Sequence, residues 1–337
     1  MDFAFPDRIQ IARLPTPIQE LPRLSEHLGG PDLYVKRDDL TGMAVSGNKV
    51  RKLEFVAARA QAEGREVLIT CGGLGSNHAR ATAAVAARLG LRCHLVLAGD
   101  RPDFPQGNLL LDLLLGAEIT YAPGSDLDDL YAEMERLAAE YAESGSQALI
   151  VPLGASDATG ALGYAFAVGE MAQQFEEMGI TPDAVVVGCG SGGTQAGLMI
   201  GKELFGLASR VVGVNVRQDE AYFRREIARI LDEFRDLYGV DVQTTEHDAH
   251  LLDGHVGAGY GQSQPEELRF IARVARTEGL LLDATYTGKA LYGLCQEIEK
   301  GTFKPGETVL FIHTGGVFSL LPQGAEFAEQ VFEIDGD

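Results

Sequence analysis

Short runs of β-branched and aliphatic residues alternate with longer amphipathic segments along most of the chain. From residue 65 onward they predict strands at 67–70, 93–97, 118–121 and 148–151, with helices at 79–89, 108–115 and 127–141 between them. A second series predicts strands at 184–187, 211–216 and 308–312. These runs carry no alternating polar positions, so we expect an α/β fold with mostly parallel sheets covered by helices on both faces.

The two series predict two doubly wound domains. The first corresponds to a small domain at residues 46–159, and the N-terminal segment is expected to join the second series in a large domain formed by 1–45 and 160–337. Ligands of such folds bind beyond the carboxyl ends of the strands, so we expect the active site in the cleft between the domains.

Composition narrows the class of protein. The chain has 337 residues, with 28 Lys and Arg against 49 Asp and Glu, a net charge of −21 that disfavours nucleic acid and anionic lipid. The acidic runs at 126–143 and 326–337 are typical of solvated helix faces, although adaptation to high salt would have the same signature. The chain has neither a long apolar run nor a basic, signal-like N-terminus, so we expect a cytoplasmic protein without a membrane span.

Neither cysteines nor histidines form a metal signature. The four cysteines stand far apart, which indicates reduced, mostly buried thiols. The run 246–250, with Asp253 and His255 after it, matches no zinc spacing and is predicted to be a polar loop, so we expect no metal.

A glycine-dense turn follows the strand at 184–187 and precedes a helix predicted at 194–205. Its residues are Gly188, Gly190, Ser191, Gly192, Gly193 and Thr194. Glycines let backbone N–H groups approach an anion, and the helix N-terminus adds positive charge, so the turn suits a phosphate. The turn also matches G-x-G-x-x-G, but a lone match is weak evidence for a dinucleotide site. Such a site is expected to have an acidic residue at the end of the next strand, whereas that strand ends in Arg217, which suits at best a 2′-phosphate. A purely structural turn is the third alternative.

A second helix start, at Ser76-Asn77-His78, suits a carboxylate. Ser76 is predicted to cap the helix, and that could be its whole purpose. Three adjacent hydrogen-bonding side chains beside free backbone N–H groups nevertheless favour an anion site.

Lys49 follows Ser46-Gly47-Asn48 at the start of a helix predicted at 50–63. Burial at such a position would lower its pKa toward the range in which an amine is nucleophilic. An ordinary surface lysine is the alternative, and Lys52 is the competing candidate. Two further segments, Tyr286-Thr287 at a helix start and His313-Thr314 after a strand, suit either a site or simple capping.

Taken in order, these segments resemble the fold-type II pyridoxal phosphate enzymes, the tryptophan synthase β-like group. The branch they resemble contains 1-aminocyclopropane-1-carboxylate deaminase, D-cysteine desulfhydrase and L-cysteate sulfo-lyase. The resemblance covers nearly the whole chain, through Leu14-Pro15-Thr16-Pro17, Val35-Lys36-Arg37-Asp38-Asp39-Leu40, Gly47-Asn48-Lys49, Ser76-Asn77-His78, Thr159-Gly160-Ala161-Leu162-Gly163-Tyr164 and Tyr286-Thr287-Gly288-Lys289.

The resemblance implies that pyridoxal 5′-phosphate is held covalently by Lys49 and that its phosphate lies on Gly190, Ser191, Gly192, Gly193 and Thr194 of the large, cofactor-binding domain. It implies that Asn77 contacts the 3′ oxygen of the cofactor, and that Ser76, Asn77 and His78 receive the substrate carboxylate. Tyr286 would lie near the substrate, with Lys49 or Tyr286 as the base. It also implies a homodimer acting on a small amino acid.

Two positions separate the branches of this family. The resemblance implies that Thr287 and Thr314 contact the cofactor. The deaminases have a glutamate and a leucine at these two positions, so the threonines follow the desulfhydrase pattern. The resemblance therefore implies α,β-elimination from D-cysteine to pyruvate, ammonia and sulfide, with L-cysteate, which gives sulfite, as the second candidate and cyclopropane deamination as the third. A nicotinamide-dependent dehydrogenase is the rival from another class. Gly75 stands where many relatives have a glutamine, which implies extra room or a different polar partner near the substrate.

Overall fold

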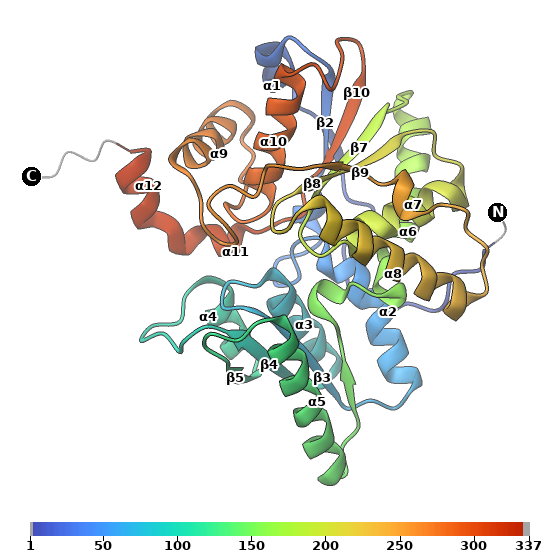
Figure 1. Cartoon of the computed structure of the whole chain (residues 1–337), viewed down its shortest axis with the longest axis vertical. Coiled ribbons are helices and arrows are strands. Elements are labelled where there is room, and N and C mark those ends of the chain that lie inside the picture. Colours follow the sequence, from blue (N-terminus) through green and yellow to red (C-terminus); the bar gives the residue numbers. More distant parts are fainter. Residues whose placement is uncertain (1–2, 333–337) are drawn as a thin grey trace, which may run out of the picture.

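Two β-sheets, each in its own lobe, form the framework of the protein (Figure 1). The computed structural model describes residues 3–332, so the outermost ends of the predicted large domain and of the acidic C-terminal run lie outside it. The six-stranded sheet has the order β1-β2-β10-β7-β8-β9 and the four-stranded sheet the order β5-β4-β3-β6. The strands are β1 (Ile18–Glu20), β2 (Asp32–Lys36), β3 (Val67–Gly73), β4 (Arg92–Ala98), β5 (Glu118–Tyr121), β6 (Ala148–Ile150), β7 (Ala184–Cys189), β8 (Arg210–Asn215), β9 (His250–Leu252) and β10 (Thr308–Ile312).

Every strand predicted from the hydrophobic runs is present, and the expected α/β fold with mostly parallel sheets is confirmed. The antiparallel pair β1 and β2 is the exception, and β2 joins the N-terminal segment to β10 in the six-stranded sheet. The sequence patterns missed β1, β2 and β9. Strands β1 and β9 have three residues each and lie at the edges of the sheet, where little apolar side chain is buried. Strand β2 lies inside the sheet, but its apolar run is only three residues long and stands between charged residues.

Helices cover both faces of the six-stranded sheet. Val185 and Val187 of β7 point into a core shared with α6 (Ala158–Met178), α7 (Gly193–Phe205) and α8 (Glu220–Tyr238). Val186 points to the opposite face, into a core shared with α1 (Pro22–Leu28), α9 (Pro265–Glu278) and α10 (Thr287–Glu299). Consecutive apolar residues are thus buried on both sides, as a doubly covered parallel sheet requires.

The four-stranded sheet is covered in the same way. Leu68 of β3 faces a core formed with α2 (Lys49–Ala62) and α3 (Asn77–Leu89), to which α4 (Gly107–Leu114) contributes Leu109. Ile69 faces α5 (Leu127–Glu143) on the other side. Two short helices near the C-terminus complete the fold, α11 (Val317–Leu320) and α12 (Gly324–Gln330).

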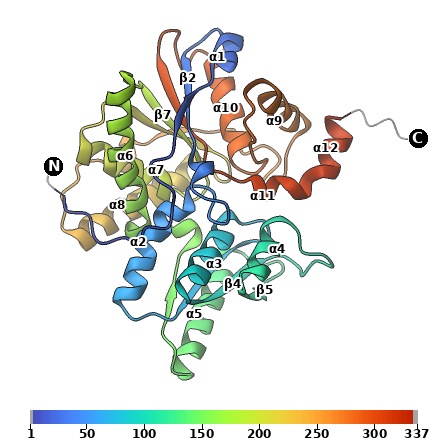
Figure 2. The ribbon, with the colours of Figure 1, turned by 180° about the vertical axis from the view of Figure 1, so that it is seen from behind.

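Helix α2 connects the two lobes, because it packs against both α3 and α6 (Figure 2). Four single-turn 3₁₀ segments also occur, at Asp38–Leu40, Leu153–Ala155, Glu246–Asp248 and Leu321–Gln323. Across residues 3–332, no helix combines the length and apolar character needed to cross a membrane.

Candidate active site

A cavity of about 1250 Å³ lies between the two lobes and brings together segments from both. Most of the predicted site residues line it, namely Lys49, Ser76, Asn77, His78, Gly190, Ser191, Gly192, Thr194, Tyr286 and Thr314. Gly193 and Thr287 do not. The volume exceeds the space needed by one small amino acid, so a cofactor and a substrate can share it.

Lys49 is the first residue of α2 and faces the cavity. The turn before it is tightly packed: the Asn48 N–H donates to the Thr314 carbonyl at 3.2 Å, and a Cβ on Gly47, where φ is +110°, would lie 2.6 Å from the same oxygen. Only glycine fits there. Burial lowers the pKa of the Lys49 amine to about 8, and no acidic side chain within residues 3–332 forms an ion pair with it. The amine can therefore act as a nucleophile or a base near neutral pH.

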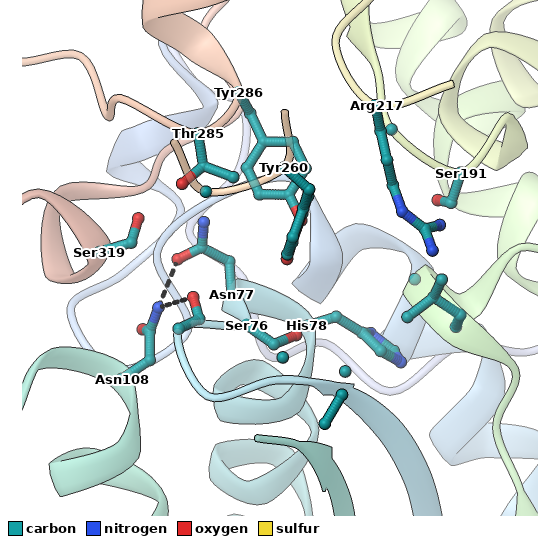
Figure 3. Close-up of a pocket in the computed structure, with 18 of the residues that line it drawn as sticks. Ser76, Asn77, His78, Asn108, Ser191, Arg217, Tyr260, Thr285, Tyr286 and Ser319 are labelled. Carbon is teal, nitrogen blue, oxygen red and sulfur yellow. Dashed lines mark hydrogen bonds between the residues drawn. The ribbon is translucent and has the colours of Figure 1, made fainter. Parts of the chain in front are cut away.

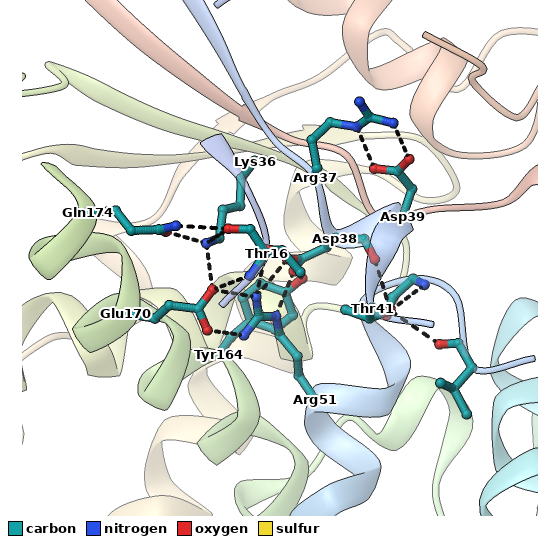
Figure 4. Close-up of polar contacts among 12 residues, drawn as sticks. Thr16, Lys36, Arg37, Asp38, Asp39, Thr41, Arg51, Tyr164, Glu170 and Gln174 are labelled. Atoms are coloured by element: carbon teal, nitrogen blue, oxygen red, sulfur yellow. Dashed lines mark hydrogen bonds and ion pairs between the residues drawn. The ribbon is translucent and has the colours of Figure 1, made fainter. Parts of the chain in front are cut away.

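A buried polar network holds α2 in place two residues beyond Lys49 (Figure 4). The Arg51 guanidinium donates to both oxygens of Asp38, at 2.8 and 2.9 Å, and to both oxygens of Glu170, at 2.9 and 3.0 Å. Lys36 donates to Glu170 as well, so two cations face two carboxylates. Thr16, Tyr164 and Gln174 supply the remaining partners. The network ties α2 to β2 and α6 and thereby fixes the position of Lys49.

The start of α3 forms one wall of the cavity (Figure 3). Ser76 caps the helix as predicted, accepting from the Ala79 N–H at 3.1 Å, and its own hydroxyl hydrogen stays free. Asn108 donates to the Asn77 side-chain oxygen at 2.9 Å and to the Gly75 carbonyl at 2.7 Å. The Asn77 amide is thereby oriented with its nitrogen available as a donor. The first backbone N–H groups of a helix also have no partner within it, so this wall offers several donors to a carboxylate.

His78 contributes differently from the expectation. The Thr70 hydroxyl donates its single hydrogen to the Val151 carbonyl at 2.7 Å, so His78 Nε2, 2.8 Å from that hydroxyl, must carry the proton. Burial lowers the pKa of the imidazole well below its usual value, so the ring is neutral. Its buried Nδ1, which has no hydrogen-bond partner in the part of the chain that the structure describes, is then an acceptor. The ring cannot donate to a carboxylate, and only the His78 backbone N–H can.

The glycine turn after β7 leads into α7 as predicted. A Cβ on Gly190 would lie 2.9 Å from the Tyr286 ring, and a Cβ on Gly193 would lie 2.8 Å from the Lys52 amine. The Lys52 amine is buried and donates only to the Gly154 carbonyl, at 3.1 Å. Burial and the nearby Lys49 hold its pKa well below the usual value. Lys52, the competing candidate to Lys49 in the sequence, is therefore a second buried amine at this helix start, and an anion bound there would favour its protonated form.

Two tyrosines lie together at the cavity, and the sequence indicated only one of them. The hydroxyls of Tyr260 and Tyr286 are 2.8 Å apart. Burial raises the pKa of Tyr286 well above its usual value, and Tyr260 adds to the effect, so Tyr286 stays protonated. Lys289 holds the Tyr260 loop by donating to the Val256 and Gly259 carbonyls, both at 2.7 Å. The glycines around Tyr260, at 257, 259 and 261, were the available signal of a functional loop.

The two threonines of the branch-specific pattern have different environments. Thr314 lines the cavity. Thr287 is buried at the start of α10, where its hydroxyl donates to Asp283 at 2.7 Å and accepts from the Asp283 N–H at 2.8 Å. The Thr287 hydroxyl thus serves the helix start, and its contact with the cofactor stays a prediction.

The residues present fit a phosphate-bearing aldehyde. Within residues 3–332, no carboxylate is bonded to the amine of Lys49 at the cavity or to that of Lys52 at the start of α7. A phosphate there would pair with the protonated form of both amines, and the helix N-terminus adds further positive charge. In the described part of the chain, no group of three or more His, Cys, Asp or Glu side chains is arranged to hold a metal ion, and 246–248 form a turn.

The cavity thus combines a reactive lysine with two helix N-termini, that of α7, which suits a phosphate, and that of α3, which suits a carboxylate. This combination defines an enzyme that carries its cofactor on an amine. The family model described as "Pyridoxal-phosphate dependent enzyme" matches residues 9–315, and the chain belongs to this family, in its 1-aminocyclopropane-1-carboxylate deaminase and D-cysteine desulfhydrase branch. Its cofactor is pyridoxal 5′-phosphate. The predicted alternative of a nicotinamide dinucleotide is therefore wrong.

Similar proteins agree with this assignment. A protein of Pyrococcus abyssi named "Putative 1-aminocyclopropane-1-carboxylate deaminase" is 41% identical over 96% of this chain and 95% of its own. A crystal structure described as an ACC deaminase homologue superposes with a TM-score of 0.89 at 38% identity, covering 96% of both chains. An L-serine ammonia-lyase from Rhizomucor miehei, 17% identical with a TM-score of 0.68 over 94% of this chain and 98% of its own, shares the fold.

Proposed function

We propose that the protein catalyses pyridoxal phosphate-dependent α,β-elimination from a small β-substituted alanine whose leaving group is sulfur. D-Cysteine, giving pyruvate, ammonia and sulfide, is the first candidate substrate, and L-cysteate, giving sulfite, is the second. One observation carries the proposal: the Lys49 amine, whose pKa is lowered, lines the same cavity as the N-termini of α3 and α7, which suit a carboxylate and a phosphate.

Each wall of the cavity then has a task. The turn at 190–194 and Lys52 would hold the phosphate, and Thr314 would face the pyridine nitrogen with a hydroxyl. Ser76, Asn77 and the free N–H groups of α3 would hold the substrate carboxylate, while Asn77 also serves the 3′ oxygen. When bound, the cofactor supplies an electron sink for the negative charge that develops at Cα.

Lys49 is the better candidate for the base that removes the Cα proton. Its pKa of about 8 leaves a useful fraction of free amine at neutral pH. Tyr286, the other candidate, has a raised pKa and remains a phenol, so we assign it hydrogen-bond donation and positioning. Elimination then breaks the Cβ–S bond with its electron pair on sulfur, and water converts the released enamine to pyruvate and ammonia.

Deamination of 1-aminocyclopropane-1-carboxylate is the competing activity, and the names of the relatives favour it. Threonines at 287 and 314 disfavour it, because the resemblance associates deaminases with a glutamate and a leucine there. A hydroxyl at the pyridine nitrogen does not promote a protonated ring as a carboxylate does, so it favours expulsion of a good leaving group over ring opening.

The test is product formation by the cofactor-loaded protein. Pyruvate should form from D-cysteine or L-cysteate, and α-ketobutyrate from the cyclopropane substrate should be negligible. Lys49→Ala should abolish turnover and the absorbance of the lysine-bound cofactor, whereas the exposed-site control Lys304→Ala should do neither. Dominant α-ketobutyrate would establish the deaminase instead, and binding of amino acids without any product would indicate a non-catalytic binder.

A further inference from the structure

Arg217 is a charged residue of the cavity that the roles assigned above do not use. It follows β8 and lines the cavity, and Figure 3 shows its side chain extending toward the other labelled lining residues. Its Nη1 atom is buried and has no hydrogen-bond partner among the described residues. No acidic side chain of residues 3–332 forms an ion pair with it, although Arg51, Arg210 and Arg229 all have one.

A guanidinium nitrogen that is buried without an acceptor is costly, so the missing acceptor is expected from a ligand. The acidic residues that border the cavity, Asp126, Asp128 and Glu326, are exposed, whereas Lys49 and Arg217 are partly buried in its wall. The interior of the cavity is thus suited to anions even though the protein as a whole carries a charge of −21.

The surroundings of Arg217 indicate which anion it meets. Its guanidinium lies 5.8 Å from the centre of the Tyr260 ring, and the Tyr260 hydroxyl is bonded to that of Tyr286. A Cβ on Gly73 would lie 3.4 Å from the Tyr260 ring, so the tyrosine pair reaches from the α3 side of the cavity to the Gly190 turn. Lys52, by contrast, lies against Gly193 at the start of α7. Arg217 therefore lies beside the tyrosine pair, whereas Lys52 and the start of α7 are the groups that would bind the cofactor phosphate.

We propose that Arg217 is a specificity-determining residue that binds a negatively charged β-substituent of the substrate. The site would then prefer an amino acid with a sulfonate or a similar anionic group on Cβ over one with a neutral thiol, which places L-cysteate ahead of D-cysteine among the candidate substrates. A planar guanidinium can donate two parallel hydrogen bonds, which match a sulfonate or a carboxylate, and Nη1 of Arg217 is available for one of them.

The chemistry of this step rests on the proposed elimination. Lys49 takes the Cα proton, the Cβ–S bond breaks with both electrons on sulfur, and the Cα–Cβ double bond forms. The sulfonate leaves as sulfite, and water completes the conversion to pyruvate and ammonia. Arg217 would face the anionic group both before and after its departure.

The first test compares Arg217→Gln, Arg217→Lys and an exposed control on α8, Arg225→Gln, as cofactor-loaded proteins. Loss of one charge-assisted pair predicts about a 100-fold fall in kcat/KM for L-cysteate in Arg217→Gln, mostly through KM. Activity on D-cysteine and the Kd for pyridoxal phosphate should change less than threefold. Arg217→Lys should recover part of the cysteate activity, and Arg225→Gln should match the parent.

Three outcomes would overturn the assignment. A matching loss of cofactor affinity would place Arg217 on the phosphate, an equal loss with D-cysteine would exclude recognition of charge, and an unchanged KM for L-cysteate would exclude any contact.

A binding measurement separates this inference from the proposed function. Each enantiomer of aspartate and serine is titrated into the loaded protein, and the visible absorbance of the cofactor is followed. Aspartate carries the β-anion without a sulfur leaving group, so it should bind more tightly than serine, and Arg217→Gln should remove the difference. If no sulfur substrate gives pyruvate, the elimination proposal fails while this preference still supports Arg217. Equal binding of aspartate and serine to the parent protein would refute the role of Arg217.

Discussion

Replacing Arg51 with methionine tests whether the buried ion network fixes the helix that carries Lys49. Arg51 forms four hydrogen bonds to Asp38 and Glu170 and one to Thr16, and its side chain is 1% exposed. Methionine keeps much of the aliphatic volume of the arginine side chain, but it leaves Lys36 as the one cation of this network for the carboxylates of Asp38 and Glu170. Breaking a buried ion pair from one side costs about 3–5 kcal/mol of unfolding free energy. At about 2.1 cal/mol/K per residue, the entropy of unfolding at the midpoint is about 0.7 kcal/mol/K, so Tm should fall by about 4–7 °C.

The assay is thermal and urea unfolding of the cofactor-loaded protein, with Arg59→Met on the same helix as the control. Arg59 pairs with Glu63 at the surface, so its replacement should cost about 0.5 kcal/mol or less. A loss below about 1 kcal/mol in Arg51→Met, or one equal to the control, would refute the reasoning.

The pH dependence of this difference has a defined sign. In the parent protein the Arg51 guanidinium, acting against the cost of burial, holds the pKa of Asp38 below its usual value. The stability gained in this way is present above the unfolded-state pKa of about 4 and is lost as the pH falls through the lower folded-state value. The stability gap between the parent and Arg51→Met should therefore be widest near neutral pH and narrow below about pH 4.

Three further predictions concern the cavity. Because the pKa of Lys49 is about 8, the fraction of free amine rises from about 9% at pH 7 to half at pH 8. The rate at which the apoprotein captures pyridoxal phosphate, measured by visible absorbance, should therefore increase about fivefold over this range, and a flat profile would contradict the lowered pKa. Asn108→Ala removes the donor that orients the Asn77 amide and should lower kcat/KM about tenfold or more, while the circular dichroism spectrum stays unchanged. A loss below twofold would show that the orientation of Asn77 by Asn108 does not matter for turnover. Gly190→Ala would place a Cβ 2.9 Å from the Tyr286 ring and should reduce the rate of pyruvate formation at least tenfold. In the control Gly75→Ala the added Cβ meets nothing within 4 Å, so the rate should stay within twofold of the parent, and similar effects of the two variants would contradict the packing argument.

Local sequence signals were sufficient for most of the helices and strands and for many of the residues that line the cavity. Runs of consecutive apolar residues identify strands buried on both faces, and Ser76 and the Gly190 turn each mark a helix start within a few residues, because capping and anion binding depend on neighbouring backbone groups. Lys49 could be singled out for the same reason, since its turn and its helix are adjacent in the chain. Short edge strands gave no comparable signal.

Contacts between distant segments determine how each side chain is used, and no local pattern contains them. Asn108 orients Asn77 from 31 residues away, and Arg51 meets Glu170 across 119 residues. Thr287 turns to Asp283 instead of the cavity, and His78 becomes an acceptor because Thr70 gives its only hydrogen to Val151. In the same way, Arg217, which follows a strand in the sequence, becomes a partly buried cation only after the chain has folded, and no acidic side chain of residues 3–332 pairs with it. Burial and pairing are properties of the packed molecule.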